Sequence, residues 1–286
     1  MDFTKAQSVG NDFVLIDAAE KTSDPAGGWP KLAEAMCDRH FGAGADGMLL
    51  LLPSKKADFR MRVFNADGSE AEACGNGLRC LVHYIHTKGI SRSGNISVET
   101  AGGVRQAEIA PASGSPRIRI GMGAPIFAPD EIPVSIAMGK GGLVCGMTVN
   151  YPLTVDNAAL KLGFVSMGNP HAVHFTDNPV ADFPLSVIGP QVETAAMFPR
   201  KTNFEVARVR NARTIEMRVW ERGVGETLAC GSGACAVAAA SWIMGYTGNE
   251  VDIILPGGKL TAEWCGQGEV YLTGQAAIVY SGCWPK

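Results

Sequence analysis

The sequence has little of what a membrane protein, a secreted protein or a nucleic-acid-binding protein requires. Its longest apolar run, Met48–Leu52, is far shorter than the roughly 20 residues of a membrane-spanning helix. A formal net charge of -3 offers no basic surface to nucleic acid. The first residues lack the basic segment followed by an apolar segment that marks a secretion signal. We therefore expect a cytoplasmic protein that binds neither membranes nor nucleic acid.

The eight cysteines include no Cys-x-x-Cys pair. Structural zinc sites and thioredoxin-like redox sites both use closely spaced cysteines, so both are disfavoured. The nearest pairs are Cys74 with Cys80 and Cys230 with Cys235, which have five and four residues between them. In a chain of this size without a secretion signal, the cysteines are expected to remain thiols. The sequence predicts no metal site.

One glycine-rich segment, Gly42–Gly47, matches the glycine spacing of dinucleotide-binding proteins. That spacing has meaning only where a strand precedes it and a helix follows. Here Leu32–Cys37 precedes it with a helical pattern, and Met48–Leu52 follows it with a strand pattern. The segment is expected to be a connecting loop, and nicotinamide and flavin cofactors are disfavoured.

The chain contains an internal repeat with two copies. Cys74-Gly75-Asn76-Gly77 recurs 156 residues later as Cys230-Gly231-Ser232-Gly233, and the same offset carries Met61–Phe64 onto Met217–Trp220. At an offset of 158, Gly10-Asn11 recurs as Gly168-Asn169. Two copies indicate gene duplication into two similar halves, rather than a solenoid of many stacked units. A length of 286 residues is consistent with two domains.

The pattern of residues predicts an α+β fold. Each Cys-Gly-x-Gly turn precedes a helical run, from Leu78 and from Ala234, and the second run has almost no polar face. Residues 124–160 have no counterpart in the first copy and are expected to bridge the halves and add strands to the second. Short β-rich segments bounded by Gly, Pro, Asn or Asp are the predicted strands: Phe13–Ile16, Met48–Leu52, Phe59–Phe64, Ile96–Glu99, Arg117–Ile120, Ala172–Phe175, Phe204–Val209, Thr214–Trp220, Val251–Leu255 and Glu269–Leu272.

A cysteine at the start of a helix is a candidate for acid–base chemistry. The exposed backbone N–H groups stabilise an anion there, which lowers the pKa of a thiol and also offers a site for a carboxylate. One such turn alone is better explained as a cysteine that fits a tight glycine turn. Two matched turns, with Cys74 and Cys230, are what an enzyme needs to remove a proton from one face of a carbon and return one to the other face.

Five motifs, in this order along the chain, resemble those of the diaminopimelate epimerase family: GNDF from Gly10, FNADGSEAEACGNGLRC from Phe64, MGNPHAV from Met167, ERGVGETLACGSGACA from Glu221 and LPGG from Leu255. The resemblance covers nearly the whole chain. It implies an isomerase of lysine and peptidoglycan precursor biosynthesis that interconverts LL- and meso-diaminopimelate without pyridoxal phosphate or any other cofactor. The family also suggests a homodimer.

The resemblance implies the architecture as well. We expect two pseudo-symmetric homologous domains, each a mostly antiparallel sheet curled around a central helix, with the active site in the cleft between them. The N-terminal half covers residues 1–120 and is joined by the last strand, at about 276–286. The C-terminal half covers residues 121–275.

Site residues follow from the resemblance position by position. Cys74 and Cys230 are the expected catalytic pair. His171 is expected to be a structural histidine beside the site, and Glu226, expected to cap or orient its helix, has no assigned role. The expected substrate-binding residues donate to a carboxylate or read the amino and carboxylate groups: Asn11, Asn65, Gly75, Asn76, Asn169, Asn203, Glu221, Arg222, Gly231 and Ser232.

Each of these residues also has an ordinary structural explanation. An asparagine in a loop most often serves a turn, and Glu221-Arg222 alone would be a solvated surface pair. Two positions depart from the family: Gln7-Ser8 replaces a common His-Gly, and Gly47 stands where some members carry a substrate-contacting glutamine. These departures affect substrate contacts and not the class of reaction.

Three alternatives remain at this stage. Proline and hydroxyproline racemases use a similar cysteine pair, and isomerases of similar architecture use a carboxylate base. Their substrates lack a distal amino-acid head, so Glu221 and Arg222 favour diaminopimelate. A non-catalytic amino-acid-binding protein of the same fold is the third alternative, and it would bind diaminopimelate without exchanging its α-proton.

Overall fold

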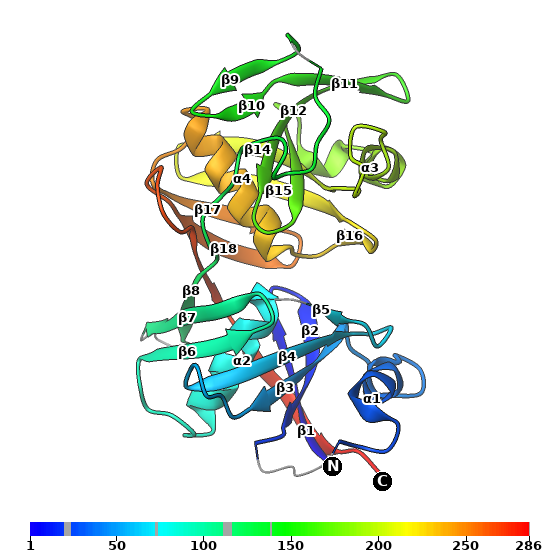
Figure 1. The fold of residues 1–286 in the computed structure, drawn as a ribbon, viewed down its shortest axis with the longest axis vertical. Coiled ribbons are helices and arrows are strands. Elements are labelled where there is room, and N and C mark those ends of the chain that lie inside the picture. Colours follow the sequence, from blue (N-terminus) through cyan, green and yellow to red (C-terminus); the bar gives the residue numbers. More distant parts are fainter. Residues whose placement is uncertain (20–23, 72–73, 111–115, 138, 286) are drawn as a thin grey trace. The chain divides into compact units, whose positions relative to one another are not determined.

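The computed structural model describes residues 1–19, 24–71, 74–110, 116–137 and 139–285 (Figure 1). The chain divides into two compact units. The first contains residues 1–121 and 273–286, and the second contains residues 122–272. Each unit combines a mixed β-sheet with helices, which confirms the α+β class predicted from the sequence.

The first unit begins and ends in neighbouring strands. β1 (Asp2–Ser8) pairs antiparallel with both β2 (Asn11–Asp17) and β20 (Ala277–Cys283), so the last strand of the chain lies beside the first. Within the described ranges of this unit, β2 runs parallel to β3 and β4 runs parallel to β6. The remaining strands of the unit are β3 (Gly47–Leu52), β4 (Phe59–Asn65), β5 (Glu70–Ala71), β6 (Asn95–Thr100), β7 (Gly103–Ala110) and β8 (Arg117–Gly121).

Two helices pack on this sheet. α2 (Gly75–Thr87), drawn in cyan in Figure 1, contacts β1, β2, β3, β4, β8 and β20, and is buried along nearly its whole length. α1 (Gly28–Cys37) buries Trp29, Ala33 and Met36, whose spacing places them on one helical face. α1 ends before residues 42–47, and β3 begins at Gly47. The glycine-rich segment is therefore a helix-to-strand loop, as predicted.

The second unit repeats this pattern of parallel pairs. β13 (Pro170–Phe175) runs parallel to β14 (Asn203–Asn211), and β15 (Thr214–Glu221) runs parallel to β17 (Glu250–Leu255). Strands β9 to β11 lie in the segment without a counterpart in the first copy. The other strands are β9 (Gly142–Val144), β10 (Met147–Val149), β11 (Tyr151–Val155), β12 (Ala158–Ser166), β16 (Gly225–Thr227), β18 (Gly258–Glu263) and β19 (Tyr271–Gln275), which crosses into the first unit.

α4 (Gly231–Ile243), drawn in orange in Figure 1, is apolar on every side. It contacts β12, β13, β14, β17 and β18, and its alanines 234, 236, 239 and 240 are fully buried. A helix without a polar face is stable in a protein interior, and here the strands bury Ala234–Ala240. α3 (Leu185–Glu193) contacts β11, β14, β15 and β16. A 3-10 turn, Val180–Asp182, precedes α3.

No helix in the described part of the chain is both long enough and apolar enough to cross a membrane.

The core of the second unit gives a stability prediction. Phe164 on β12 is fully buried and packs its ring against Tyr151 and Phe198, at centroid distances of 5.5 and 5.8 Å. Phe164→Ala should lower the free energy of unfolding by about 3–5 kcal/mol, because it leaves a cavity among these rings. Phe41→Ala is the control, since Phe41 is 90% exposed. Equal midpoints in urea for both variants would contradict this account of the core.

Candidate active site

Cys74 is the N-cap residue of α2. Its backbone is extended, with φ -144° and ψ 112°, and its Sγ accepts a hydrogen bond from the backbone N–H of Gly77 at 3.4 Å. The sulfur thus takes the place of the oxygen that usually caps a helix. Gly77 is required here, because a Cβ on it would lie 2.9 Å from Cδ2 of Leu49 in β3.

Asn11 connects β2 to this turn. Its Oδ1 accepts from Nδ2 of Asn76 at 3.3 Å and lies 3.9 Å from the Cys74 sulfur, while its Nδ2 donates to Oδ2 of Asp46 at 2.9 Å. A carboxylate only accepts, so Asp46 determines which end of the Asn11 amide faces the cysteine. Arg79, fully buried on α2, donates to Ser8 Oγ at 2.9 Å and also to Asn76 Oδ1.

A charged network lies on the other side of Asn11. Asp12 forms ion pairs with Lys5 at 2.7 Å and Arg39 at 2.9 Å, and Arg39 also pairs with Asp46 at 2.7 Å. Burial by itself would raise the pKa of Asp12, but hydrogen bonds from Arg39 and Lys5 lower that pKa to about 2. The network therefore holds Asp46, and through it Asn11, in a fixed position.

Two further positions of the candidate site, Asn65 and Gly47, lie in the first unit. Asn65, at the end of β4, donates from Nδ2 to Ser69 Oγ at 2.9 Å and is opposite Gly47 in the register of β3 with β4. A Cβ on Gly47 would lie 2.7 Å from the backbone oxygen of Phe64. This backbone therefore has no room for a side chain at position 47.

Cys230 caps α4 in the same way as Cys74 caps α2. Its backbone is extended, with φ -116° and ψ 117°, and its Sγ accepts from the N–H of Gly233 at 3.4 Å. The Ser232 hydroxyl lies 3.4 Å from the same sulfur and accepts from Nδ2 of Asn169 at 3.4 Å. Asn169 and Ser232 occupy the positions that Asn11 and Asn76 have in the first copy, but here Ser232 contacts the sulfur and the asparagine donates to Ser232.

The electrostatics around Cys230 are unfavourable to a thiolate. Burial raises the pKa of Cys230 well above its ordinary value, and the carboxylates of Glu221 and Glu205 raise it further. Hydrogen bonds from Ser232 and Gly233 act in the opposite direction but are smaller effects. The hydrogen bond from the helix terminus lowers this pKa as expected, but burial and the two carboxylates outweigh it, so the net shift is upward.

Glu221 lies beside Cys230. Burial raises the pKa of Glu221, while hydrogen bonds from Thr227 and Cys230 act to lower it. The adjacent Arg222 is exposed, and its backbone N–H donates to Oδ1 of Asn203 at 2.9 Å. Within the described ranges no carboxylate pairs with the Arg222 guanidinium.

Asn203 and Glu226 are two further residues of the second unit that the sequence analysis singled out. Asn203 spans two strands, because its Nδ2 also donates to the Pro170 backbone oxygen at 2.8 Å. Glu226 does not cap a helix as expected. It accepts from Arg218 at 2.8 and 3.0 Å across β15 and β16, so its role is an ion pair between strands.

His171 lies behind Asn169 and is fully buried. Its Nε2 is 2.9 Å from Asn169 Oδ1, and its Nδ1 is 2.6 Å from Oε1 of Glu205, which is also fully buried. Sequence reasoning missed Glu205, Asp46 and Arg79. The signal for Glu205 was present in the repeat, since the offset of 156 places it where the first copy has Leu49.

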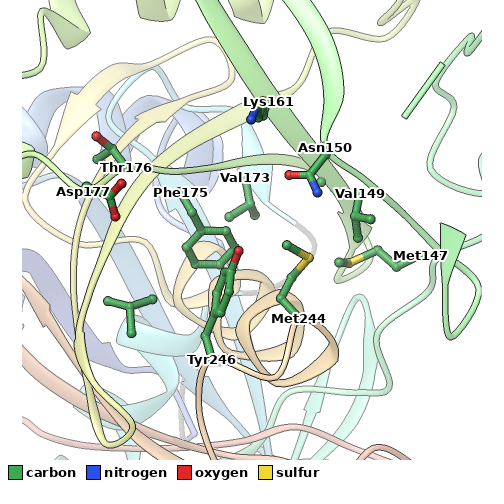
Figure 2. Close-up of a pocket in the computed structure, with 12 residues that line it drawn as sticks. Met147, Val149, Asn150, Lys161, Val173, Phe175, Thr176, Asp177, Met244 and Tyr246 are labelled. Carbon is green, nitrogen blue, oxygen red and sulfur yellow. The ribbon is translucent and has the colours of Figure 1, made fainter. Parts of the chain in front are cut away.

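A cavity of about 380 Å³ lies elsewhere in the second unit (Figure 2). Met244 and Tyr246, which follow the C-terminal end of α4, line it, and the Tyr246 ring meets Phe175 edge to face at 5.2 Å. Cys230 is at the N-terminal end of the same helix, about 20 Å away at 1.5 Å per residue. None of the predicted site residues lines this cavity.

The network around Asp12 predicts a dependence of stability on pH. Because the pKa of Asp12 is lower in the folded chain than the roughly 3.9 of an unfolded aspartate, its contribution is complete above about pH 4 and is lost as the pH falls toward 2. Asp12→Asn should lower the free energy of unfolding at pH 7 by about 1–2 kcal/mol, after allowance for solvent screening.

The measurement is denaturant unfolding of wild type and Asp12→Asn between pH 2 and pH 7. The two proteins should converge in stability at the acid end. Asp2→Asn, which changes an exposed carboxylate on β1, is the control and should follow wild type throughout. A difference between wild type and Asp12→Asn that is constant with pH would contradict the assignment.

Comparison with known proteins supports the resemblance found in the motifs. The family model for diaminopimelate epimerase matches residues 3–128 and 163–279. The diaminopimelate epimerase of Pelotomaculum thermopropionicum is 46% identical over 286 residues, covering 100% of this chain and 99% of the relative. The diaminopimelate epimerase of Methanococcus maripaludis is 42% identical over 285 residues, covering 99% of each.

Solved structures show the same fold at much lower identity. A Bacillus anthracis phenazine biosynthesis protein of the PhzF family has a TM-score of 0.68 at 15% identity, covering 99% of this chain and 98% of its own. A hydroxyproline epimerase from Agrobacterium vitis has a TM-score of 0.68 at 13% identity, with coverages of 99% and 90%. The fold is thus shared with phenazine biosynthesis proteins and proline-type epimerases, and the full-length sequence matches show that the chain belongs to the diaminopimelate epimerase family.

Proposed function

We propose that this chain interconverts LL- and meso-diaminopimelate with Cys74 and Cys230 as its two bases and with no cofactor. The observation that carries this proposal is the matched pair of cysteine-capped helices. In each one a sulfur accepts the N–H of the third residue of a Cys-Gly-x-Gly turn at 3.4 Å. Membership of the family supplies the substrate and the reaction, and it supports a function in lysine and peptidoglycan precursor biosynthesis.

The chemistry requires two sulfurs on opposite faces of one α-carbon. One thiolate removes the α-proton, and the electron pair of the broken C–H bond remains on the carbon. The thiol on the other face donates its proton to that carbon, so the configuration inverts and the two cysteines exchange protonation states. The reverse reaction, which starts from the other isomer, restores the original protonation states of the two cysteines. In this scheme Cys74 comes from the N-terminal half, residues 1–120 with 276–286. Cys230 comes from the C-terminal half, residues 121–275.

The raised pKa of Cys230 suits the thiol partner of this pair. A thiol that stays protonated at neutral pH can donate to a carbanion, whereas a thiolate at the same place could only accept. Because two sulfurs at one carbon interact, they titrate as a coupled pair and not as independent groups.

The turns also explain how the substrate is held. The N–H groups of Gly75, Asn76, Gly231 and Ser232 lie at helix N-termini, where backbone donors and the helix dipole favour an α-carboxylate. Stabilising this group lowers the energy of the carbanion that forms beside it. Asn11, Asn65, Asn169 and Asn203 provide amides around the two turns. We propose that they read the amino and carboxylate groups.

Arg222 with Glu221 is the feature that selects diaminopimelate. Arg222 is exposed and has no carboxylate partner in the described ranges, so its guanidinium is available to bind a second carboxylate through two hydrogen bonds. A proline-type substrate has no distal amino-acid head and would leave this pair unused. We also propose that the chain acts on a small molecule and assembles as a homodimer.

Replacing either cysteine tests the two-base assignment. Cys74→Ala and Cys230→Ala should each lower kcat by at least about 100-fold, because alanine cannot carry a proton. The assay is incubation with LL-diaminopimelate in deuterated water, following α-deuterium and the meso isomer. Cys265→Ala, which changes an exposed cysteine, is the control. A protein that binds diaminopimelate but never exchanges its α-proton would be a binding protein and not an epimerase.

Arg222→Met tests the substrate. A hydrogen bond to a charged group is worth about 1.5–3 kcal/mol, so kcat/KM for diaminopimelate should fall by about 10-fold or more. Arg210→Met is the matched control, because Arg210 is a half-exposed arginine that pairs with Glu216. If Arg222→Met behaves like wild type, or if the wild type prefers proline or hydroxyproline, the diaminopimelate assignment fails.

A further inference from the structure

The His171–Glu205 pair is an ionisable pair in a place where the fold accepts apolar residues. Both side chains are fully buried, and Nδ1 of His171 lies 2.6 Å from Oε1 of Glu205. The repeat offsets of 158 and 156 relate these positions to Phe13 and Leu49 in the first copy. Burying such a pair is usually no more stabilising than burying apolar side chains of similar volume.

The strand registers support this correspondence. In the parallel pair β2–β3, Phe13 is next to Gly47 and Leu15 is next to Leu49. In the parallel pair β13–β14, His171 is next to Asn203 and Val173 is next to Glu205. The first unit folds with phenylalanine and leucine at the two positions, so the architecture does not require a histidine and a glutamate.

A continuous chain of contacts leads from Glu205 to the cysteine. His171 Nε2 lies 2.9 Å from Asn169 Oδ1, and Asn169 Nδ2 lies 3.4 Å from Ser232 Oγ. Ser232 Oγ in turn lies 3.4 Å from Cys230 Sγ. The middle of this chain contains Asn169 and Ser232, two residues proposed above to bind the substrate.

Glu205 also lies directly beneath the turn that Cys230 caps. A Cβ on Gly233 would lie 2.8 Å from Glu205 Oε1, whereas the corresponding contact of Gly77 is with the Leu49 side chain. The second oxygen of Glu205, Oε2, is buried and has no hydrogen-bond partner among the described residues. Among the described residues, His171 is thus the hydrogen-bond partner of this carboxyl group, at a position where the first copy has the apolar Leu49.

The hydrogen bonds determine where the protons lie. Since Nδ2 of Asn169 faces Ser232, Oδ1 of Asn169 faces the imidazole and can only accept, so Nε2 of His171 carries a hydrogen. The remaining short contact, between Nδ1 and Glu205 Oε1, then holds one proton. It is on the carboxyl group if the ring is neutral and on the ring if the pair is ionic. The ring orientation is the same in both cases.

We propose that Glu205 is a positioning residue for the reaction: it fixes the His171 ring with Nε2–H directed at Asn169, and so directs the Asn169 amide N–H toward Ser232 and the substrate. This inference rests on the proposed function of Asn169 and Cys230. In the first unit the amide oxygen, and not the amide N–H, faces the cysteine turn. Asp46 accepts from Nδ2 of Asn11 and so directs the Oδ1 of Asn11 toward Cys74. The equivalent amides thus present an acceptor at one cysteine and a donor at the other turn.

Three variants of the full chain separate positioning from packing. Glu205→Leu removes the hydrogen bond to His171. His171→Phe with Glu205→Leu installs the pair that the first unit uses at these positions. Glu205→Gln keeps a donor for Nδ1, since its amide N–H can replace the carboxyl proton while Nε2–H still faces Asn169. Leu49→Met, a volume-conserving change at the equivalent position of the first unit, is the control.

We expect Glu205→Leu to lower kcat/KM for diaminopimelate by about 100-fold, the loss that a misplacement of about 1 Å causes. The double variant should recover the melting temperature of wild type and remain about 100-fold less active. Glu205→Gln should stay within about threefold of wild type, because the orientation of the ring is kept. A double variant with near-wild-type kcat/KM would overturn the proposal, and so would a Glu205→Gln variant as inactive as Glu205→Leu.

A second readout does not depend on turnover. The rate of Cys230 modification by methyl methanethiosulfonate at pH 8, measured by peptide mass spectrometry, should change at least about threefold in Glu205→Leu and not in Glu205→Gln or Leu49→Met. If wild type fails to epimerise diaminopimelate but this pattern holds, the proposed function fails and the positioning role stands. If wild type is active and Glu205→Leu matches it in both assays, the positioning role fails and the function stands.

Discussion

The rest of the candidate site depends on a backbone constraint at two helix starts. The first N–H groups of a helix have no partner within it, and in α2 and α4 the partner of the third one is a cysteine sulfur at 3.4 Å. This bond fixes both sulfurs at the start of their helices, which is also where the helix dipole and the backbone N–H groups favour a carboxylate. A nucleophilic atom and an anion site therefore come from one piece of local geometry.

The two sulfurs have different surroundings although their turns are alike. Cys74 has Asn11 beside it and a network of Lys5, Asp12, Arg39 and Asp46 behind it. Cys230 is buried next to Glu221, with Glu205 beneath its turn, and burial and these acids raise its pKa. A two-base reaction needs one thiol and one thiolate at a time. The surroundings that differ between the copies therefore favour Cys230 as the thiol when no substrate is bound.

Local patterns were enough to predict much of this site. The glycine turns, the apolar run of α4 and the helix-then-strand order around residues 42–47 all depend on neighbours within a few residues, and all were predicted correctly. Contacts between distant residues were not predicted. Glu205 lies 34 residues from His171, and Glu226 meets Arg218 only because β15 and β16 pair. Parallel pairs such as β2–β3 join strands separated by a helix, so no short pattern reveals them.

The duplication provides a comparison within the molecule that separates fold from function. Backbone features shared by both copies, such as the parallel strand pairs and the glycine turns, belong to the architecture. Where one copy has Leu49 and the other has Glu205, the sheet and the helix turn form equally well with either residue. This buried glutamate is not needed by the fold, and one of its oxygens has no hydrogen-bond partner in the part of the chain that the structure describes, so it must be explained by what it holds in place. In this chain that is His171, and through it the amide beside Cys230.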